Sequence, residues 1–222
     1  MPPMPPLKQG RFIAFCGGEG GGKSTQIRLL AEHLLRHGVP AVITREPGGT
    51  PGGAQLRQLL LTASGGNWEP EAEALLMVAD RVQHLAQVIR PALDAGSHVL
   101  TDRYAYSTFA YQGAGKGVAM PFLQALHRDA CGDFWPDLTF ILDLDPEKGV
   151  ARSKRRLVVE ASTEDRFEKL SLDFHSRVRA EFRRLAEFGP APAIVIDAGR
   201  TIAEVAAEIR AHADHLLGLP PS

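Results

Sequence analysis

Gly17-Gly18-Glu19-Gly20-Gly21-Gly22-Lys23-Ser24-Thr25 is the stretch that decides the fold of this chain. It follows the apolar run 12–16, which is typical of a buried strand, and precedes residues 26–35, which are typical of a helix. The glycines let consecutive backbone N–H groups converge on one anion, and the start of the helix adds partial positive charge. In this context Lys23 is expected to reach the outer phosphates of a nucleotide, and the Ser24 hydroxyl to bind Mg²⁺. The alternative, a glycine-rich turn capped by Ser24, does not explain why strand, spacing, lysine and helix all agree.

The composition of the 222-residue chain is that of a globular protein, with 44% hydrophobic and 23% charged residues. The net charge of −1 argues against a large nucleic-acid-binding surface. Because Cys16 and Cys131 lie far apart, neither a disulfide framework nor a zinc cluster is expected. No apolar run approaches the ~18 residues of a membrane span, and the proline-rich residues 1–10 lack the apolar core of a signal peptide. We therefore expect a cytoplasmic protein with a loose N-terminal tail.

The rest of the chain alternates apolar strands with helices. Besides residues 12–16, the runs expected to be strands are 41–44, 98–101, 138–144 and 193–197. Helices are expected over residues 53–62, 71–93, 120–130, 146–156, from after 166 to about 188, and over 201–217, with loops at 64–67 and in the glycine-rich stretch that ends at Gly117. This pattern predicts one α/β domain over residues 11–217, built on a five-stranded parallel sheet with helices on both faces, and a C-terminal tail at 218–222.

Charged or phosphate-binding groups follow four of the predicted strands. They are the loop at Gly17, Arg45, the pair Asp102-Arg103, and Asp143. Because parallel strands all end at the same edge of a sheet, these groups are expected to converge. Asp102 is a candidate Mg²⁺ ligand, and the planar guanidinium of Arg103 suits a second phosphate. The alternative for Asp102-Arg103 is a structural ion pair at the sheet edge.

A basic cluster, formed by Arg152, Lys154, Arg155 and Arg156, lies in the predicted helix after residue 145. Such a cluster is ordinarily a solvated helix face. Here, however, the phosphate loop contains no arginine, and the polar segment 160–166 follows the cluster directly. Since an arginine can stabilise a transferring phosphoryl group, we interpret residues of about 150–168 as a mobile lid that carries catalytic arginines. Arg152, Arg155 and Arg156 all remain candidates.

Three further motifs carry a resemblance to a known family. They are Thr44-Arg45-Glu46-Pro47-Gly48-Gly49-Thr50, Ala79-Asp80-Arg81-Val82-Gln83, and Asp102-Arg103-Tyr104 followed by Ser107-Thr108 and Ala110-Tyr111-Gln112-Gly113. Together with the phosphate loop, they make the chain similar to thymidylate (dTMP) kinases from about residue 11 to 217. It resembles the bacterial type whose catalytic arginines sit in the lid, with Gly20 where other members carry a loop arginine. The resemblance implies a P-loop nucleotide-kinase fold with a small lid.

The resemblance also implies roles for individual residues. Residues 17–25 would hold the phosphates of ATP, and Lys23 and Asp102 would act in phosphoryl transfer, with Mg²⁺ on Ser24 and Asp102. The implied contacts to dTMP are Glu19 beside the sugar, Arg45 and Arg103 on the phosphate, Arg81 on the thymine edge, Thr108 and Gln112 in the base pocket, and Tyr104 beside the deoxyribose. A lid arginine would close over the phosphates, Arg166 would anchor the lid, and the protein would be a homodimer.

One position departs from the family pattern. Met77 stands one helical turn before Arg81, where the family places a phenylalanine that stacks on thymine. Methionine covers a base face and contacts aromatic rings through its sulfur, but it lacks a flat π surface. We therefore expect a weaker thymine clamp. Phe109 and Trp68 are the other aromatic candidates, although both fit better as core residues.

Two other readings compete with dTMP phosphorylation. A kinase of the same fold could act on another nucleoside monophosphate or on a deoxynucleoside, but Arg45 and Arg103 favour an acceptor that carries a phosphate. A P-loop switch or partitioning ATPase is disfavoured, because the Asn-Lys-x-Asp motif that reads guanine is missing and Glu19 stands where partitioning ATPases carry a signature lysine. ATP and dTMP are thus the expected substrates, with no nucleic acid or membrane as a partner.

Overall fold

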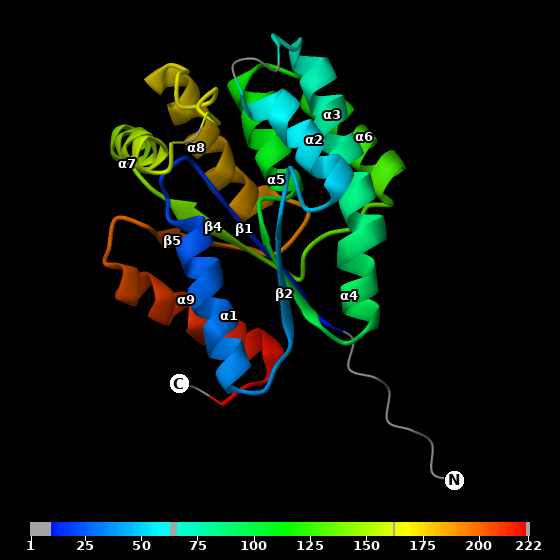
Figure 1. Cartoon of the computed structure of the whole chain (residues 1–222), viewed down its shortest axis with the longest axis vertical. Helices are drawn as coiled ribbons and strands as arrows, with labels where there is room; N and C mark the ends of the chain where they lie inside the picture. The colour runs from blue at the N-terminus through cyan, green and yellow to red at the C-terminus, as the bar shows by residue number, and fades with distance from the viewer. Residues whose placement is uncertain (1–9, 63–65, 162, 221–222) are drawn as a thin grey trace.

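The computed structural model describes residues 10–62, 66–161 and 163–220 (Figure 1). The predicted N-terminal tail up to residue 9, residues 64 and 65 of the predicted loop, residue 162, and the chain end at 221–222 lie outside the described residues.

Within the described residues, five strands form one parallel sheet in the order β2-β3-β1-β4-β5. The strands are β1 (Phe12–Gly17), β2 (Ala41–Arg45), β3 (His98–Asp102), β4 (Leu138–Asp143) and β5 (Ala193–Asp197). Each lies where an apolar run predicts a strand, so the predicted sheet is confirmed. Every residue of β1 is buried, as expected for the central strand of a sheet that is covered on both faces.

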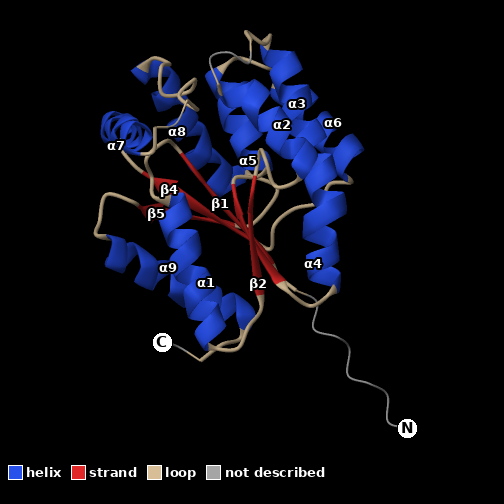
Figure 2. Cartoon of the chain, in the orientation of Figure 1, coloured by secondary structure: helices blue, strands red, loops and turns tan. Residues whose placement is uncertain are grey.

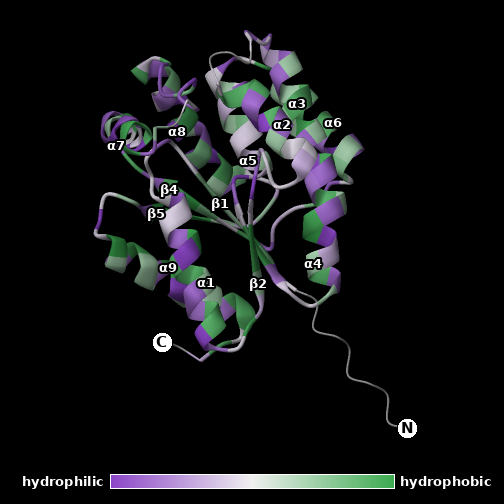
Figure 3. Ribbon diagram, viewed as in Figure 1, coloured by the Kyte–Doolittle hydropathy of each residue, from purple (hydrophilic) through white to green (hydrophobic). Residues whose placement is uncertain are grey.

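Helices cover both faces of this sheet (Figures 1 and 2). They are α1 (Lys23–Arg36), α2 (Pro51–Leu61), α3 (Pro70–His84), α4 (Arg90–Asp94), α5 (Ala105–Thr108), α6 (Met120–Cys131), α7 (Pro146–Val159), α8 (Leu172–Phe188) and α9 (Ile202–Leu217). Alternate side chains of β1 enter the cores on opposite faces: Ile13 and Phe15 pack with α1 and α9, whereas Ala14 and Cys16 face the helices on the other side. In Figure 3 the surrounding helices carry both hydrophobic and hydrophilic residues, as expected for elements with one face on a core.

The register of the sheet brings the predicted strand ends to one edge. Arg45 of β2 lies opposite Asp102 of β3, and Phe15 of β1 also pairs with Asp102. The phosphate loop leaves the sheet at the carboxyl end of β1, where Gly17 pairs with Leu142 of β4. Ligands of open α/β sheets bind beyond such carboxyl ends, so the fold places the phosphate loop, Arg45 and Asp102 around a common site.

The chain is helical throughout the predicted range 71–93, but it is not α-helical throughout. A π-helical turn over Leu85–Ile89 separates α3 from α4. Pro91 lies in the first turn of α4, and it has no N–H to donate to the carbonyl four residues earlier. A local shift of the hydrogen-bond ladder to wider spacing accommodates such a proline.

The loop predicted up to Gly117 begins later than expected. A second π-helical segment, Phe109–Gly115, continues directly from α5. A Cβ atom at Gly115 would lie 2.5 Å from Cε2 of Phe174 on α8. The glycine in this stretch thus permits α8 to approach the segment closely, and it does not mark a loop.

Candidate active site

A cavity of about 710 Å³ lies at the carboxyl edge of the sheet. In Figure 1 this edge faces the space between α7 on one side and α2 on the other. The cavity is lined by most of the residues that the sequence singles out: Glu19, Gly20, Gly21, Gly22, Lys23, Ser24, Thr25, Arg45, Met77, Arg81, Asp102, Arg103, Tyr104, Thr108, Gln112, Arg152 and Arg156. Gly17 and Gly18 instead border a small cavity beneath the loop, and Arg155 is not among the lining residues.

The phosphate loop is held in a conformation that requires glycine. Gly20 has φ 64° and Gly22, which caps α1, has φ 84°, and side chains rarely adopt such angles. A Cβ atom at Gly20 would also lie 2.2 Å from the carbonyl oxygen of Gly149 on α7 and 3.0 Å from Cβ of Arg152. The loop and α7 therefore pack backbone against backbone at Gly20.

Lys23 spans the phosphate loop. Its Nζ donates to the carbonyl oxygens of Gly18, at 2.8 Å, and Gly17, at 3.3 Å. Burial and the nearby positive charge of Arg103 lower the pKa of Lys23. An anion in the loop would offset both effects.

Ser24 and Asp102 fit a divalent cation. The Ser24 hydroxyl donates to Oδ2 of Asp102 at 3.0 Å. Among the described residues, the buried Oδ1 of Asp102 has no hydrogen-bond partner. A hydroxyl oxygen next to a carboxylate with a spare oxygen is a donor set that suits Mg²⁺, which binds proteins through few ligands and keeps several waters.

Arg103 and Glu19 form a half-buried ion pair across the cavity floor. Nη2 of Arg103 donates to Oε1 of Glu19 at 2.9 Å, and Nη1 donates to the Gly17 carbonyl at 3.1 Å. The Tyr111 hydroxyl donates to the same Glu19 oxygen at 2.6 Å. Burial alone would raise the pKa of Glu19, but the charges of Arg103 and Lys23 outweigh it and lower the pKa to about 2. Arg103 has φ 73°, a strained conformation for a side-chain-bearing residue, as is often found at functional sites.

Arg81 is fixed on the opposite side of the cavity. Its Nε donates to Glu46 at 2.9 Å, its Nη2 donates to the Thr108 hydroxyl at 3.0 Å, and its guanidinium lies 5.0 Å from the centre of the Tyr104 ring. Within the described part of the chain, the buried Nη1 has no hydrogen-bond partner. Arg81 thus carries one unused donor in a cavity that it lines.

Below Arg81 the motif around Glu46 forms a buried polar cluster. Glu46 also bonds Nδ1 of His84 at 3.0 Å, and Nε2 of His84 lies 2.7 Å from the Thr44 hydroxyl. Oδ1 of Asp80 accepts from the Gly48 N–H at 3.1 Å. Burial and the adjacent charge of Glu46 raise the pKa of Asp80 to about 6. Glu46 therefore positions Arg81. This role is not evident from the sequence, where Glu46 is simply the residue after Arg45.

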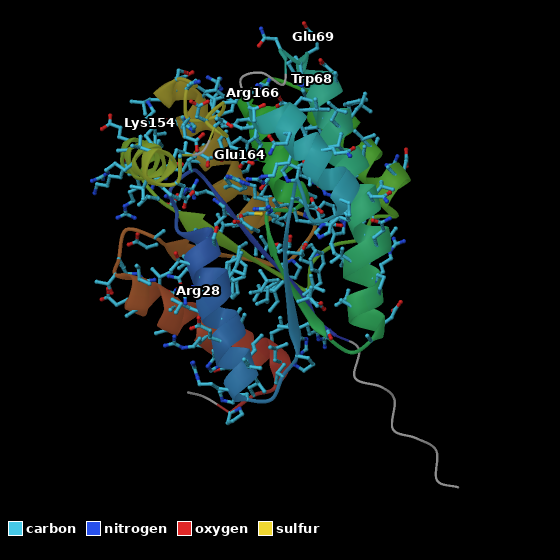
Figure 4. All side chains as sticks on the ribbon, viewed as in Figure 1. Arg28, Trp68, Glu69, Lys154, Glu164 and Arg166 are labelled. Carbon is cyan, nitrogen blue, oxygen red and sulfur yellow. The ribbon has the colours of Figure 1, made fainter. Side chains whose placement is uncertain are left out.

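The residues around the predicted thymine clamp divide into two groups. Met77 and Tyr104 line the cavity, although Tyr104 is almost wholly buried and its hydroxyl donates to the Phe134 carbonyl at 2.9 Å. Phe109 is a core residue, and Trp68 donates its Nε1–H to the Leu59 carbonyl at 3.2 Å at the outer end of α3 (Figure 4). Neither Phe109 nor Trp68 borders the cavity.

The arginines of α7 are exposed and weakly held. Asp145 caps this helix by accepting from the N–H groups of Glu147 and Lys148. The three candidate arginines make long hydrogen bonds of 3.4 Å: Arg152 to the Ala198 carbonyl, Arg155 to the Ala151 carbonyl, and Arg156 to the Ser153 hydroxyl. Arg152 and Arg156 border the cavity, whereas Arg155 does not.

The segment after α7 is tied to α2 and α3 across the cavity. Arg57 of α2 binds both carboxylate oxygens of Glu164, at 2.9 and 2.5 Å, and the Pro47 carbonyl at 3.0 Å. Arg166 bonds the Leu60 carbonyl at 3.0 Å and pairs with Glu73. Figure 4 shows Glu164 and Arg166 in the region between α7 and the helices α2 and α3, with Lys154 on α7 itself.

Several residues of the site are not assigned a role by the sequence. Tyr111 and Glu46 lie within the quoted motifs, so the motifs themselves are the signal that could have found them. Phe167 borders the cavity and packs edge-on against the Tyr111 ring at 5.3 Å, and Glu168 accepts from the Ser153 hydroxyl at 2.6 Å. Asp143, by contrast, is bound by Arg179 at 2.7 and 2.9 Å and borders the small cavity beneath the loop, so it does not join the main cavity as predicted.

In this structure a phosphate loop faces fixed arginines across one cavity, at the edge of a parallel sheet of order β2-β3-β1-β4-β5. These features together define a P-loop nucleotide kinase. A family model for thymidylate kinase matches residues 15–209. The chain belongs to the thymidylate kinase family.

Individual relatives agree with the family match. A thymidylate kinase of Cereibacter sphaeroides is 51% identical over 199 residues, which cover 90% of this chain and 92% of the relative. One of Magnetococcus marinus is 49% identical over 201 residues, covering 90% and 94%. A crystal structure of thymidylate kinase from Ehrlichia chaffeensis superposes with a TM-score of 0.74 at 31% identity, covering 93% of this chain and 99% of that one.

Proposed function

We propose that this protein transfers the γ-phosphoryl group of ATP to dTMP by direct in-line displacement, giving ADP and dTDP for dTTP synthesis. The observation that carries the proposal is a single cavity bordered by a phosphate loop on one side and by Arg81 on the other. A cavity that bound only one nucleotide would not need both the phosphate loop and the arginine on the opposite wall. Membership of the thymidylate kinase family supports the same reaction.

On the donor side, residues 17–25 are proposed to hold the phosphates of ATP. Lys23 exchanges its loop carbonyls for the outer phosphates, which relieves the cost of its burial. Ser24 and Asp102 are proposed to hold Mg²⁺, because their oxygens lie 3.0 Å apart and Asp102 offers a second oxygen. When bound, Mg²⁺ supplies charge neutralisation for the transferred group.

On the acceptor side, Arg45 and Arg103 are proposed to aim the dTMP phosphate at the donor. Arg45 is exposed at the cavity wall, so it is available to a phosphate that enters. Arg103 is already oriented by Glu19, which itself approaches the sugar of dTMP. Since the acceptor phosphate is an anion, no general base is needed, and the protein contributes alignment and charge.

The base is proposed to bind between Arg81, Thr108 and Gln112. Nη1 of Arg81 donates to the base edge, Met77 covers a face of the ring, and Tyr104 closes the pocket beside the deoxyribose. Support comes from the position of all five residues at the cavity wall.

Residues of about 150–168 are proposed to act as a lid whose arginines close over the transferring phosphoryl group. Arg152 and Arg156 are favoured because they border the cavity with weak existing bonds, and Arg155 is assigned a smaller part. Arg166 anchors the lid through Glu73 and the Leu60 carbonyl. Closure excludes water and so suppresses hydrolysis of ATP.

We further propose a cytoplasmic homodimer built from a single domain over residues 11–217. Exposed apolar side chains of α2, α3 and α6 support an interface on these helices: Leu59, Leu75, Val82 and Phe122. Sedimentation velocity would test it, and a monomer at micromolar concentration would contradict it. No helix in the described part of the chain is long and apolar enough to cross a membrane.

A coupled assay of ADP release tests the proposed reaction. ATP is offered with dTMP, dUMP, dCMP, dGMP, AMP or thymidine in turn, and dTMP is expected to be the preferred acceptor. Exclusive turnover of thymidine, or of another monophosphate, would replace the proposal by a related kinase. ATP turnover that needs DNA and not dTMP would revive a partitioning ATPase.

A further inference from the structure

Glu73 of α3 is a fully buried carboxylate that receives three donors from other parts of the chain. Nε2 of Gln112 donates to its Oε1 at 2.8 Å, and Nζ of Lys116 donates to its Oε2 at 2.8 Å. Arg166 also pairs with Oε2. Glu73 does not border the cavity, whereas its partner Gln112 does. Glu73 can therefore affect a ligand only through another residue.

The bond between Glu73 and Gln112 has a direction that chemistry dictates. An amide carries a donor and an acceptor end of nearly equal shape, and its orientation is set by its neighbours. A carboxylate that already receives two cationic donors can only accept hydrogen bonds. Gln112 must therefore turn its NH₂ group toward Glu73, which leaves the carbonyl oxygen as the group that it offers to a ligand.

This orientation complements the donor on Arg81. Arg81 and Gln112 both line the cavity: Arg81 carries a buried Nη1 donor with no partner within the described residues, and Gln112 keeps its carbonyl oxygen as an acceptor. The edge of thymine offers an acceptor at O4 and a donor at N3–H. Cytosine offers a donor at N4 and an acceptor at N3, which is the reverse. A pocket with the amide in this direction matches thymine and mismatches cytosine.

We propose that Glu73 is a specificity-determining positioning residue: by accepting only, it fixes the direction of the Gln112 amide and so excludes 4-aminopyrimidine nucleotides such as dCMP. The inference rests on the proposed function, since it assumes that the base binds against Arg81 and Gln112. A glutamine at position 73 could either donate or accept, so the Gln112 amide could then turn over.

The test is the kcat/KM of Glu73→Gln for dTMP and for dCMP, compared with the unchanged protein. Because mispairing one buried polar group costs about tenfold or more in binding, we expect kcat/KM for dTMP to fall about tenfold and that for dCMP to rise about tenfold. A rise for dCMP is the decisive readout, because loosening of the pocket alone would lower both values. A parallel fall for the two acceptors would overturn the proposal.

Two control variants distinguish an effect on the orientation of the Gln112 amide from a general loss of contacts around Glu73. Lys116→Met removes one cationic partner of Glu73 but leaves an acceptor-only carboxylate, so the dTMP to dCMP ratio should stay unchanged. Glu73→Asp keeps the acceptor and should retain the ratio even where both rates fall. A collapse of the ratio in Lys116→Met would show that charge balance, and not amide direction, sets the specificity.

Folding and function are monitored separately. Thermal melting of each variant shows whether it folds. If Glu73→Gln does not fold, Gln112→Met carries the test: the dTMP to dCMP ratio must fall at least about tenfold, and an unchanged ratio would overturn the proposal. If the unchanged protein does not phosphorylate dTMP at all, the proposed function fails, which is a distinct result.

Discussion

The two sides of the cavity differ in how firmly their arginines are held. Arg81, on the proposed base side, is buried and bonded to Glu46 and Thr108 at 2.9 and 3.0 Å. Arg152 and Arg156, on α7, are exposed and make bonds of 3.4 Å to a backbone carbonyl and a serine hydroxyl. The side around Arg81 is organised before a ligand arrives, whereas the α7 side, proposed to face the transferred phosphoryl group, is not.

This difference indicates which arginines are ordered before the substrates bind and which become ordered only when they bind. A guanidinium that is already oriented loses little conformational freedom on binding, so the base side can select an acceptor at low entropic cost. Ordering an exposed arginine costs up to about 2 kcal/mol, and this cost is offset only when phosphates are present. Such an arrangement favours recognition first and charge stabilisation second, which is the order that limits ATP hydrolysis in water.

The largest effect is expected where the two sides meet, at Arg103. Arg103→Ala should lower kcat/KM for dTMP by about 10³-fold, because an oriented donor to the acceptor phosphate is lost. The dissociation constant for ATP should change little. An equal loss of ATP affinity, measured by calorimetry, would show that Arg103 serves the donor nucleotide, since its Nη1 also bonds the Gly17 carbonyl.

The proposed role of the exposed α7 arginines can be tested by substituting them one at a time. Arg152→Ala and Arg156→Ala should each lower kcat by about 10²-fold with little change in the KM for dTMP, because their charge is needed in the transition state. Arg155→Ala should have a smaller effect, and Lys154→Ala, on the same helix, serves as the matched control. Equal losses in all four variants would mean that the net charge of α7 matters and not the position of each arginine.

The buried polar cluster around Glu46 is expected to lower the stability of the protein at neutral pH. Asp80 is buried beside Glu46 with its pKa raised from 3.8 to about 6, so the folded protein holds this proton more tightly than the unfolded chain does. Stability from this group is therefore lost as pH rises from about 4 to about 6. Asp80→Asn keeps an acceptor for the Gly48 N–H without the charge, and it should raise the free energy of unfolding above pH 6 by about 1–3 kcal/mol.

Urea unfolding of Asp80→Asn and the unchanged protein at pH 8 and pH 4 measures this difference. The two proteins should nearly converge at pH 4, where Asp80 is protonated in the folded state and close to half protonated in the unfolded chain. A variant that is less stable at pH 8 would show that the Asp80 charge is needed by Arg81 or His84.

The smallest effect is expected at Met77. Met77→Phe should restore a flat surface over the thymine ring and lower the KM for dTMP about fivefold, since base stacking on an aromatic ring contributes about 1–3 kcal/mol and methionine already supplies part of the contact. Steady-state kinetics with dTMP measures it, with the KM for ATP as the internal control. An unchanged or higher KM for dTMP would indicate that Phe167, which also borders the cavity, already covers the base.

Local patterns in the sequence predict the strands and the phosphate loop correctly, because each depends on neighbours in the chain. They do not predict that Pro91 shifts the helix ladder to a π-turn, or that Gly115 serves the close approach of Phe174. Both features depend on how a segment packs against the rest of the fold or relieves a local clash, and the spacing of hydrophobic residues carries no information on either.

The same limit applies to the site. Arg45, Asp102 and Arg103 line the cavity because parallel strands share an edge, whereas Asp143, bound by Arg179, does not. Glu73 escapes prediction, since in the sequence it is one of several acidic residues near the start of a helix and its partners lie 39 to 93 positions away. Buried carboxylates that orient other side chains become visible only in three dimensions.

The backbone contact between Gly20 and Gly149 restricts which residues position 20 can accept. An arginine at position 20 has no room while α7 begins where it does, because even its Cβ atom would meet the Gly149 carbonyl at 2.2 Å. A side chain at position 20 would therefore require the loop or the start of α7 to shift, so these two segments restrict each other's sequence.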